Sequence, residues 1–507
     1  MSSDVTLDPR APVLVGVGAV QQRLEDPRVA LEPVELMIAA LERAAADAGS
    51  HALLRRANSI RVPRGFWDYA DPGRIIAERF GATAARTQVA EIGVLQTTLF
   101  GHAAQAIASG EEEVVLIAGG EAKYRSLRAQ ITGVPAPLTA QSGVEPDSVL
   151  RPAREIWSAL EADFGLLMPV NQYSIMETAL RRAEGLSIDA HRHEVARLWA
   201  DFSRVAAENS SAWNREAIGA DDIAGTHGGN RMLAFPYTKL HNSQWNVDQA
   251  AGLICCSIAA ARAAGVPESR WVFPLAVADS NHMVPLSERA ELHRSHGVRI
   301  AGQRALEVAG LGIAAVEHFE LYSCFPVAVR VQAHELGILA GRCLTVTGGM
   351  AFAGGPLNNF VLQAMVRMAE ILRADPGSVG MVTAVSGMLT KQGVSLWSTR
   401  PSAQPFRFVD VTAEVARDRK TVEVVGEYEG RATVAGYTVL YEGDAPVRAV
   451  MICDVPDGRR TLGATTDRQL AAAMTAQEFC GCSVRIGPGR VVTSIVDSTR
   501  PDADAIA

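Results

Sequence analysis

The sequence lacks any long hydrophobic run and any excess of positive charge. The longest apolar stretch, residues 250–261 (AAGLICCSIAAA), is shorter than the ~18 residues that a membrane helix needs. The formal net charge of −8 gives no basis for binding nucleic acid or an anionic membrane. The first ten residues, MSSDVTLDPR, contain two aspartates and no apolar core, unlike a secretory signal. We therefore expect a cytoplasmic protein with no membrane span and no nucleic-acid partner.

Paired cysteines are also missing. The seven cysteines are scattered, their number is odd, and no CxxC pair occurs. This pattern argues against a disulfide framework and a zinc site, and it is typical of reduced thiols. His191, His193 and Glu194 form an HxHE cluster, but at helical spacing these side chains lie only partly on one face. A solvated helix start is the preferred interpretation, and no metal site is predicted.

What the sequence does contain is one series of helices and strands that occurs twice. The chain has 507 residues, 48% hydrophobic and 21% charged, which suits two or three globular domains. The first series is a strand, two helices and a buried strand that ends in two glycines, at residues 12–20, 33–49, 95–109 and 113–118. The second series is a strand, a helix, a strand, a helix and a strand, at residues 271–278, 298–309, 318–322, 358–373 and 379–385. Two such series predict two similar α/β halves packed together.

Two further regions differ from the two halves in their pattern of apolar and polar residues. Residues 123–245, between the halves, contain helical runs at 172–183 and 191–207 and are expected to form a mostly helical insertion. From about residue 403, short alternating runs separated by Gly, Asp and Pro predict a small antiparallel β-barrel with one helix at 466–475. These runs are VDVTAEV (409–415), TVEVVGEYEG (421–430), RATVAGYTVLYE (431–442), PVRAVMICDV (446–455) and CSVRIG (482–487).

The stretch TGGMAFAGGPLNN, residues 347–359, has four glycines and no titratable side chain. Such a loop can bring its backbone against a ligand, because Gly lacks a Cβ and accepts positive φ. It leads into a predicted helix that Asn358 is able to cap, and the first N–H groups of a helix suit an anionic or carbonyl-bearing ligand. A plain strand-to-helix turn is the alternative interpretation, and the sequence leaves both open.

Residues 8–398 resemble the thiolase superfamily, most closely the sterol-carrier-protein-2 type and its thiolase-like relatives. The resemblance rests on the duplicated order, the insertion and segments such as IASGEEEVVLIAGGEA (107–122) and GGMAFAGGP (348–356). It implies an α/β fold: a duplicated thiolase fold, layered αβαβα, with a mostly helical insertion and a C-terminal small β-barrel. The implied domains are an N-terminal half (8–122 and 246–269), the insertion (123–245), a C-terminal half (270–399) and an OB-like barrel (403–507).

The resemblance also implies that the thiolase catalytic groups are replaced. The window for the nucleophilic Cys is residues 93–96, GVLQ, which holds no Cys, Ser or Thr. Gly355 stands where the GHP motif has its general-base His. Ser386 stands in the last motif, where the family has an acid/base Cys, and a serine without a partner is too weak a base at neutral pH. Claisen condensation and thiolysis need all three groups, so ordinary thiolase turnover is expected to be absent.

The remaining motif is YSCF, residues 322–325. Tyr322 falls at the position of the oxyanion-hole Asn or His, and its phenol can donate one hydrogen bond to a thioester oxygen. Cys324 matches a Cys that is not the attacking residue in the sterol-carrier type, so it is interpreted as a buried core thiol. Tyr322, Cys324 and Ser386 are thus only weak catalytic candidates. The histidines considered as their partners are His102, His241 and His318.

The resemblance retains a pocket for CoA or an acyl-CoA thioester as a non-covalent ligand. Ser243, Gln244, Gly354 and Gly355 are the predicted ligand-binding residues, the first two because they fall near a pantetheine contact of thiolases. The third domain resembles, through residues 436–460, the OB-like barrel that accompanies some thiolase-like proteins. It has few aromatics and many acids, which argues against single-strand binding. We expect it to dock onto the thiolase half or onto a protein partner, and a homodimer is also considered.

Three functions remain open. The first is a thiolase-like protein that binds CoA or acyl-CoA thioesters in lipid metabolism without ordinary acetyl-CoA acetyltransferase turnover. The second is an acyltransferase, hydrolase or aldol-type lyase that acts on acyl-CoA with non-thiolase residues. The third is an assembly or scaffold protein. These functions are drawn from the resemblance in fold, which by itself does not select a reaction.

Overall fold

The structure is a computed structural model that describes residues 7–156 and 158–497. Within these residues the strands form three sheets, with the orders β1-β8-β4-β2-β3-β5, β10-β11-β12-β9-β13 and β16-β15-β14-β17-β18. The first sheet consists of β1 (Pro12–Gln22), β2 (Ser59–Pro63), β3 (Arg86–Ala90), β4 (Val114–Ala122), β5 (Ser148–Leu150) and β8 (Asp248–Ser257). The second consists of β9 (Phe273–Ser280), β10 (His318–Glu320), β11 (Val379–Ser386), β12 (Lys391–Ser398) and β13 (Phe408–Asp410).

The first two sheets repeat one arrangement. In the order β2-β4-β8-β1, the first pair is parallel and the next two are antiparallel. The order β10-β11-β12-β9 has the same directions. Helix α1 (Pro33–Ala48) follows β1 as α11 (His296–Ala309) follows β9, and α4 (Gln96–Ser109) precedes β4 as α13 (Phe360–Ala374) precedes β11. The duplication predicted from the sequence is confirmed.

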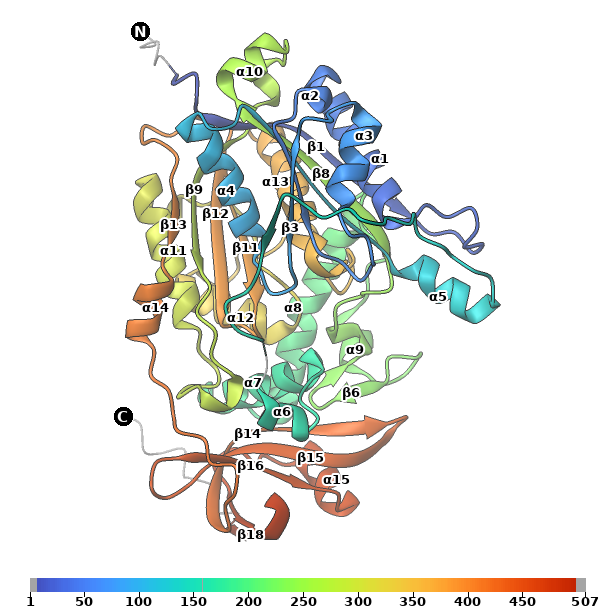
Figure 1. Cartoon of the computed structure of the whole chain (residues 1–507). Coiled ribbons are helices and arrows are strands. Elements are labelled where there is room, and N and C mark those ends of the chain that lie inside the picture. Colours follow the sequence, from blue (N-terminus) through green and yellow to red (C-terminus); the bar gives the residue numbers. More distant parts are fainter. Residues whose placement is uncertain (1–6, 157, 498–507) are drawn as a thin grey trace.

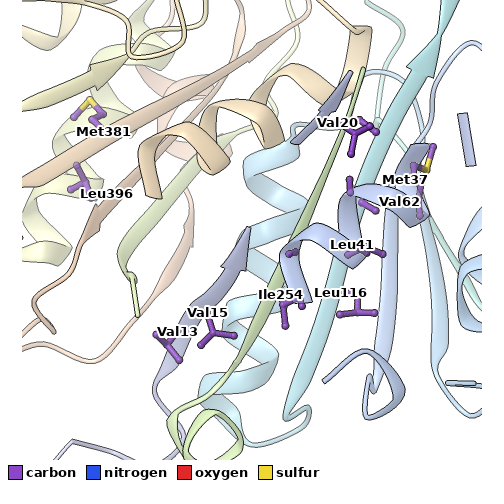
Figure 2. Packing of buried hydrophobic residues seen from close by; sticks show 14 of the residues in the cluster. Val13, Val15, Val20, Met37, Leu41, Val62, Leu116, Ile254, Met381 and Leu396 are labelled. Atoms are coloured by element: carbon purple, nitrogen blue, oxygen red, sulfur yellow. The ribbon is translucent and has the colours of Figure 1, made fainter. Parts of the chain in front are cut away.

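Helices α4 and α13 form a central layer between the two sheets (Figure 1). One buried cluster joins Leu99 of α4 and Met365 of α13 to Ile117 of the first sheet and Val382 of the second. On the outer face of the first sheet, Leu41 of α1 packs near Ile254 and other apolar side chains of the sheet (Figure 2). Helix α11 contacts β9 and β12 of the second sheet. The order helix, sheet, helix, sheet, helix confirms the predicted layered fold.

The insertion supplies helices and a small hairpin below these layers. Its elements are α5 (Lys123–Thr132), α6 (Ala159–Asp163), α7 (Pro169–Ala183), α8 (Ile188–Glu208), α9 (Ala220–Ala224), β6 (Met232–Ala234) and β7 (Tyr237–Thr238). The remaining helices of the two halves are α2 (Ala52–Arg55), α3 (Pro72–Phe80), α10 (Ile258–Ala263) and α12 (Pro326–Leu336). No helix of residues 7–156 and 158–497 combines the length and the apolar character needed to cross a membrane.

The third sheet forms the small C-terminal β domain. The domain consists of β14 (Gly430–Glu442), β15 (Ala445–Asp454), β16 (Arg460–Thr465), β17 (Ser483–Ile486) and β18 (Val492–Asp497), with helix α15 (Arg468–Ala476). The insertion adds β6 and β7 to the same sheet, through the pairing of β6 with β14. A single bridge between Ala464 and Val491 connects its two outer strands, so the sheet curls toward closure. Residues 498–507, which were also assigned to this domain, lie outside the described residues.

The start of the expected barrel region folds differently from the prediction. Residues 408–410 form β13, which pairs with β9 and so extends the second sheet, and 412–418 form helix α14 (Thr412–Asp418). VDVTAEV was therefore wrongly predicted to be a strand throughout. Its buried Val411 and Val415 are four residues apart, which is the spacing of one helical face. TVEVVGEYEG was also wrongly predicted to be a strand. It forms isolated β-bridges instead, from Thr421 to Arg289 and from Val424 to Arg460.

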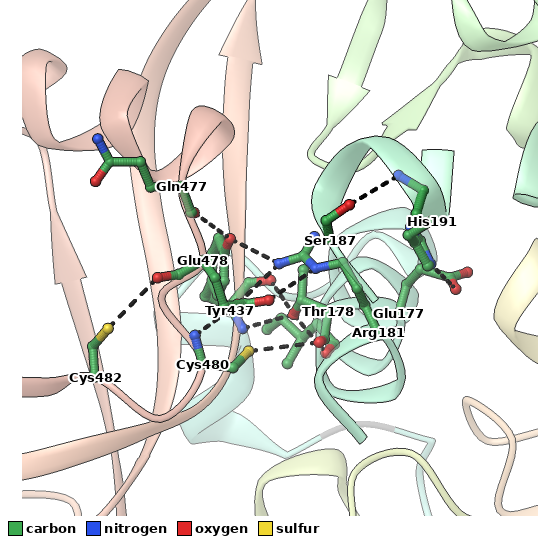
Figure 3. A network of polar contacts seen from close by, with 12 residues as sticks. Glu177, Thr178, Arg181, Ser187, His191, Tyr437, Gln477, Glu478, Cys480 and Cys482 are labelled. Carbon is green, nitrogen blue, oxygen red and sulfur yellow. Dashed lines mark hydrogen bonds and ion pairs between the residues drawn. The ribbon is translucent and has the colours of Figure 1, made fainter. Parts of the chain in front are cut away.

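The C-terminal domain docks onto α7 of the insertion (Figure 3). The Thr178 hydroxyl donates to the Tyr437 carbonyl at 2.8 Å and accepts from the Tyr437 N–H at 3.0 Å. The buried Arg181 guanidinium donates to both carboxylate oxygens of Glu478 and to the Tyr437 hydroxyl, each at 3.0 Å. Arg460 also donates to backbone carbonyls of 287–290 in the C-terminal half. The domain therefore binds the insertion as well as the expected thiolase half.

Replacing Arg181 with Met tests this docking. The variant leaves Glu478 without its bidentate partner and Tyr437 without a donor, so we expect the free energy of unfolding to fall by about 2–4 kcal/mol. Urea denaturation followed by circular dichroism measures the change. The control is Arg192→Met on α8, where an exposed Arg192 pairs with Asp189 and a change within about 0.5 kcal/mol is expected. Equal effects of the two substitutions would contradict the role given to Arg181.

Candidate active site

The beginnings of the two central helices bring the predicted motifs together. The Gln96 side chain, in the first turn of α4, donates to Asn358 Oδ1 at 3.2 Å, and Asn358 Nδ2 donates to the Arg64 carbonyl at 2.8 Å. Asn358 was predicted to cap the helix, and this prediction is wrong. A short 3₁₀ turn, Leu357–Asn359, precedes α13, and its N-cap residue Asn359 makes no side-chain capping bond. The Asn358 amide instead connects the two halves.

The carboxylate of Glu320, on β10, binds the residues that lead into the Gly-rich loop. This buried carboxylate accepts the N–H groups of Val346 and Thr347, each at 2.8 Å, and the hydroxyls of Thr345 and Thr347. Burial raises the pKa of Glu320 to about 7, against the opposing effect of these donors. Because two N–H groups and two hydroxyls converge on one carboxylate, the chain entering the loop has a single defined path.

Glycine is required within this loop. Gly354 has φ 103°, in the left-handed region, and a Cβ there would lie 2.1 Å from Gln249 Oε1. Gly355 donates its N–H to the Gln244 carbonyl at 2.8 Å, and its missing Cβ would lie 3.1 Å from Ser243 Cβ. The backbone here packs directly against the segment that precedes β8.

Ser243 and Gln244 connect this loop to the YSCF motif. The Gln244 N–H donates to the Met350 carbonyl at 2.9 Å, and the Ser243 hydroxyl donates to the Cys324 carbonyl at 3.0 Å. All four predicted ligand-binding residues thus lie in one place, Ser243 and Gln244 against Gly354 and Gly355. The hydrogen bonds that they make in the structure are to the protein backbone.

Tyr322 and Cys324 line the same place. Tyr322 is half-buried, and its ring meets Phe360 edge-on with 5.9 Å between ring centroids. Cys324 is buried, and burial raises the pKa of its thiol to about 12. Burial also raises the pKa of Tyr322. Both groups therefore stay protonated at neutral pH, so Cys324 is a poor nucleophile and Tyr322 is a hydrogen-bond donor.

Ser386 lies at the carboxyl end of β11, partly exposed, with Lys391 of β12 as its register partner. The Lys391 side chain is completely buried, and its Nζ donates to the Gly93 carbonyl at 3.1 Å. Gly93 begins the window, residues 93–96, to which the resemblance assigns the position of the thiolase nucleophile. Sequence reasoning missed Lys391, although a lone lysine between the Ser-Gly turn at 386–387 and the apolar run VSLW at 394–397 is an available signal.

Strained backbone occurs at the end of the Gly-rich loop and in the turn between β11 and β12. Leu357 follows Gly-Gly-Pro with φ 44°, and Met388 and Leu389 follow Ser386-Gly387 with φ 50° and 68°. A bulky residue in the left-handed region costs about 1–3 kcal/mol, and such strain concentrates at functional sites. Met388 and Leu389 are nevertheless buried in one apolar cluster with Cys324 and Met350, which holds the turn in place.

None of the three histidines considered as partners is paired with the catalytic candidates. His318 bonds Asp375 at 2.9 Å, His102 packs edge-on against Phe408, and His241 bonds the Thr238 hydroxyl at 2.9 Å. His191 bonds the buried Glu177 at 2.8 Å, so it belongs to the interior of the insertion. Across the described ranges, no group of three or more His, Cys, Asp or Glu side chains is placed to hold a metal ion.

An exposed aromatic pair lies beside the site. The rings of Phe66 and Trp245 are 51% and 44% exposed and meet edge-on at 6.2 Å. The Lys123 ammonium lies 4.4 Å from the Phe66 centroid and 4.0 Å from that of Trp245. Trp245 directly follows Gln244, which is bonded to the Gly-rich loop. We call these three residues the aromatic–lysine patch.

Comparison with known proteins agrees with this architecture. A family model described as "Thiolase-like protein type 1 additional C-terminal domain" matches residues 410–489. A monomeric SCP2-thiolase like protein type 1 from Mycobacterium smegmatis is 28% identical over 96% of this chain and 100% of that chain, with a TM-score of 0.80. No curated protein matches the chain.

Two more distant structures share the fold alone. The Ltp2-ChsH2(DUF35) aldolase is 19% identical over 77% of this chain and 99% of that chain, with a TM-score of 0.56. The dimeric peroxisomal thiolase of Saccharomyces cerevisiae is 15% identical over 78% of this chain and 98% of that chain, with a TM-score of 0.55. These matches cover most of the chain but not all of it.

Replacing Glu320 with Gln tests how the Gly-rich loop is held. The amide nitrogen of Gln cannot accept the hydrogen bonds that the second carboxylate oxygen accepts, so buried donors lose a partner. We expect the free energy of unfolding at neutral pH to fall by about 1–3 kcal/mol, measured by urea denaturation. Glu317→Gln, near the start of the same strand, is the control. A stability equal to that of the wild type would show that the carboxylate does not organise the loop.

Proposed function

We propose that the site binds CoA or an acyl-CoA thioester and does not carry out ordinary thiolase turnover. The chain joins a thiolase-like fold to the additional C-terminal domain of thiolase-like protein type 1. The observation that carries this proposal is the convergence of the Gly-rich loop, the Ser243–Gln244 segment and the aromatic–lysine patch. Together they place exposed rings and a cation next to a glycine backbone that a ligand can approach closely.

The two ends of the ligand are assigned to different parts of this surface. Exposed rings stack on nucleobases, and an ammonium group pairs with phosphates, so the aromatic–lysine patch is assigned to the nucleotide of CoA. The thioester is assigned to the beginnings of α4 and α13, where Asn358 contacts Gln96 and Lys391 contacts Gly93. The half-buried Tyr322 phenol is a donor suited to the thioester oxygen.

The absence of thiolase turnover is proposed from the groups at the three catalytic positions. Residues 93–96 contain no nucleophilic side chain, and Gly355 contributes only backbone. Cys324 is the thiol in the motif beside them, but burial keeps it protonated. The three positions thus lack the thiol nucleophile, the imidazole base and the acid/base thiol with which thiolases condense two acyl units. We propose a role in lipid metabolism from the resemblance to thiolases. We propose a cytoplasmic location from the scattered cysteines, which are typical of reduced thiols.

We further propose that the protein acts as a monomer. The outer edge of β3 is covered by β5, and the outer edge of β9 is covered by β13, both from the same chain. An edge strand that is already paired has no free N–H and C=O row to offer to a second copy. In this proposal the C-terminal domain packs against the insertion of its own chain and stabilises it. In a scaffold protein, by contrast, this domain would be free to bind a partner.

Calorimetric titration with CoA and a series of acyl-CoAs tests ligand binding. We expect saturable binding by the wild type. In the presence of a second acyl-CoA, mass spectrometry should find no condensation product. Trp245→Ala should weaken CoA binding by about 1–3 kcal/mol, because one stacking surface is lost.

The control for this substitution is Leu339→Ala, at an apolar side chain that is 76% exposed and lies outside the patch. It should leave the affinity for CoA unchanged. No saturable binding of CoA or any acyl-CoA to the folded wild-type protein would end the proposal, and a condensation product would contradict the proposed lack of thiolase turnover.

A further inference from the structure

The buried Lys391 has no electrostatic partner that explains its burial. Its ammonium has three donor protons, and the Gly93 carbonyl accepts one of them. No Asp or Glu forms an ion pair with Lys391 anywhere in residues 7–156 and 158–497. Glu155, which is exposed, is the carboxylate whose charge acts on it, and burial lowers the pKa of Lys391 against that influence. A buried lysine without an ion pair, placed opposite a serine hydroxyl, is a candidate base.

Ser386 is the nucleophile that this lysine can serve. The two residues face each other in antiparallel register across β11 and β12, and directly opposite residues have side chains on one face of the sheet. That face is turned toward the first turn of α4. At Gly393, two residues beyond Lys391, a Cβ would lie 1.9 Å from Thr97 Oγ1.

The surroundings of Ser386 leave its hydroxyl available. The residue is partly exposed, and its hydroxyl makes no hydrogen bond with the described part of the chain. The strained turn at Met388 and Leu389, anchored by the burial of both side chains, fixes the hairpin that carries Ser386 and Lys391. The nearby N–H groups of the first turn of α4 have no intrahelical partner and can receive an oxyanion.

We propose that Ser386 and Lys391 form a nucleophile–base pair that transfers the acyl group of a bound thioester to the Ser386 hydroxyl. The proposal rests on the proposed function, since it needs a thioester at this site. It goes beyond that function because it gives the protein an acyl-transfer step that does not use the thiolase residues. It also supplies the partner that a serine needs to react at neutral pH.

The step is balanced by the groups present. Neutral Lys391 takes the hydroxyl proton while Ser386 Oγ forms a bond to the acyl carbon, and the C–S bond then breaks. The proton passes from Lys391 to the departing CoA sulfur, which leaves as the free thiol. The products are an ester on Ser386 and CoA. Water then adds to the ester with Lys391 again as the base, which releases a carboxylic acid and restores the serine.

The test is rapid mixing of the full-length protein with acetyl-CoA, with released thiol measured over time and peptides analysed by mass spectrometry. The wild type should release CoA in a burst and carry an acetyl group on the peptide that contains Ser386. Ser386→Ala should lose both signals. Lys391→Met, which keeps the length of the side chain without a buried charge, should keep CoA binding and slow acetylation by about 100-fold or more.

Two controls separate a general effect from a specific one. Ser109→Ala, at the opposite end of α4, and Lys420→Met, at an exposed lysine, should acetylate like the wild type. Circular dichroism and calorimetric binding of CoA establish that each variant is folded and competent. Equal acetylation of Ser386 in Lys391→Met and the wild type would overturn the role of Lys391, and an acetyl group on any other residue would overturn that of Ser386.

A second probe distinguishes failure of this inference from failure of the proposed function. The activated ester 4-nitrophenyl acetate can acylate a reactive serine without any CoA site. Binding of acetyl-CoA with no acylation by either reagent would overturn the Ser386–Lys391 pair and leave the proposed function standing. Acylation of Ser386 by the ester, lost in Lys391→Met, without any binding of CoA would support the pair and reject the proposed function.

Discussion

The need to bury two sheet faces against one shared helical layer governs this structure. Helices α4 and α13 lie between the sheets and are surrounded by apolar side chains, so little polar chemistry can occur along their length. Their N-terminal ends are different, because the first N–H groups of a helix have no partner within it. The Gly-rich loop, the YSCF motif and the β11–β12 hairpin meet at these ends. The site therefore lies where the two central helices begin, because their first backbone N–H groups have no partner within the helix.

A second constraint is the burial of charge around the insertion. Arg181 and Glu478 pair across the boundary between α7 and the C-terminal domain. Arg330 of α12, in the C-terminal half, pairs with Glu177 of α7, in the insertion. Removing one member of such a pair leaves the other buried without compensation, so these contacts fix how the elements dock. β6 of the insertion also pairs with β14, which makes the insertion and the C-terminal domain parts of one sheet. The C-terminal domain thus supports the insertion that adjoins the site.

The site lies in a thiolase-like fold and contains few reactive groups. Gly355 offers only backbone, and the protonated Cys324 is packed in the apolar interior. At the same place, the sheet opposes Ser386 with a buried lysine whose nearest polar contact is the carbonyl of Gly93. One fold can hold different reactive groups at the same place, which is why the fold does not name the chemistry.

The sequence by itself determined the duplicated α/β order, the positions of the main helices and strands, and the family resemblance. These follow from local periodicity and from short motifs, such as the helix at 33–48 and the strand at 114–122. It also located Ser386 and the Gly-rich loop. The prediction that Asn358 caps α13 was wrong, because the bonds of its amide to Gln96 and Arg64 depend on residues about 260 and 290 positions away.

Only the tertiary structure decided what these motifs face. The pairing of Ser386 with Lys391 depends on a strained four-residue turn, and the approach of Lys391 to Gly93 joins residues 298 positions apart. The run from 409 to 415 alternates like a strand, yet long-range burial of Val411 and Val415 makes its second part a helix. Such contacts arise when two sheets close over a shared layer, and local sequence patterns carry no record of which distant side chains then become neighbours.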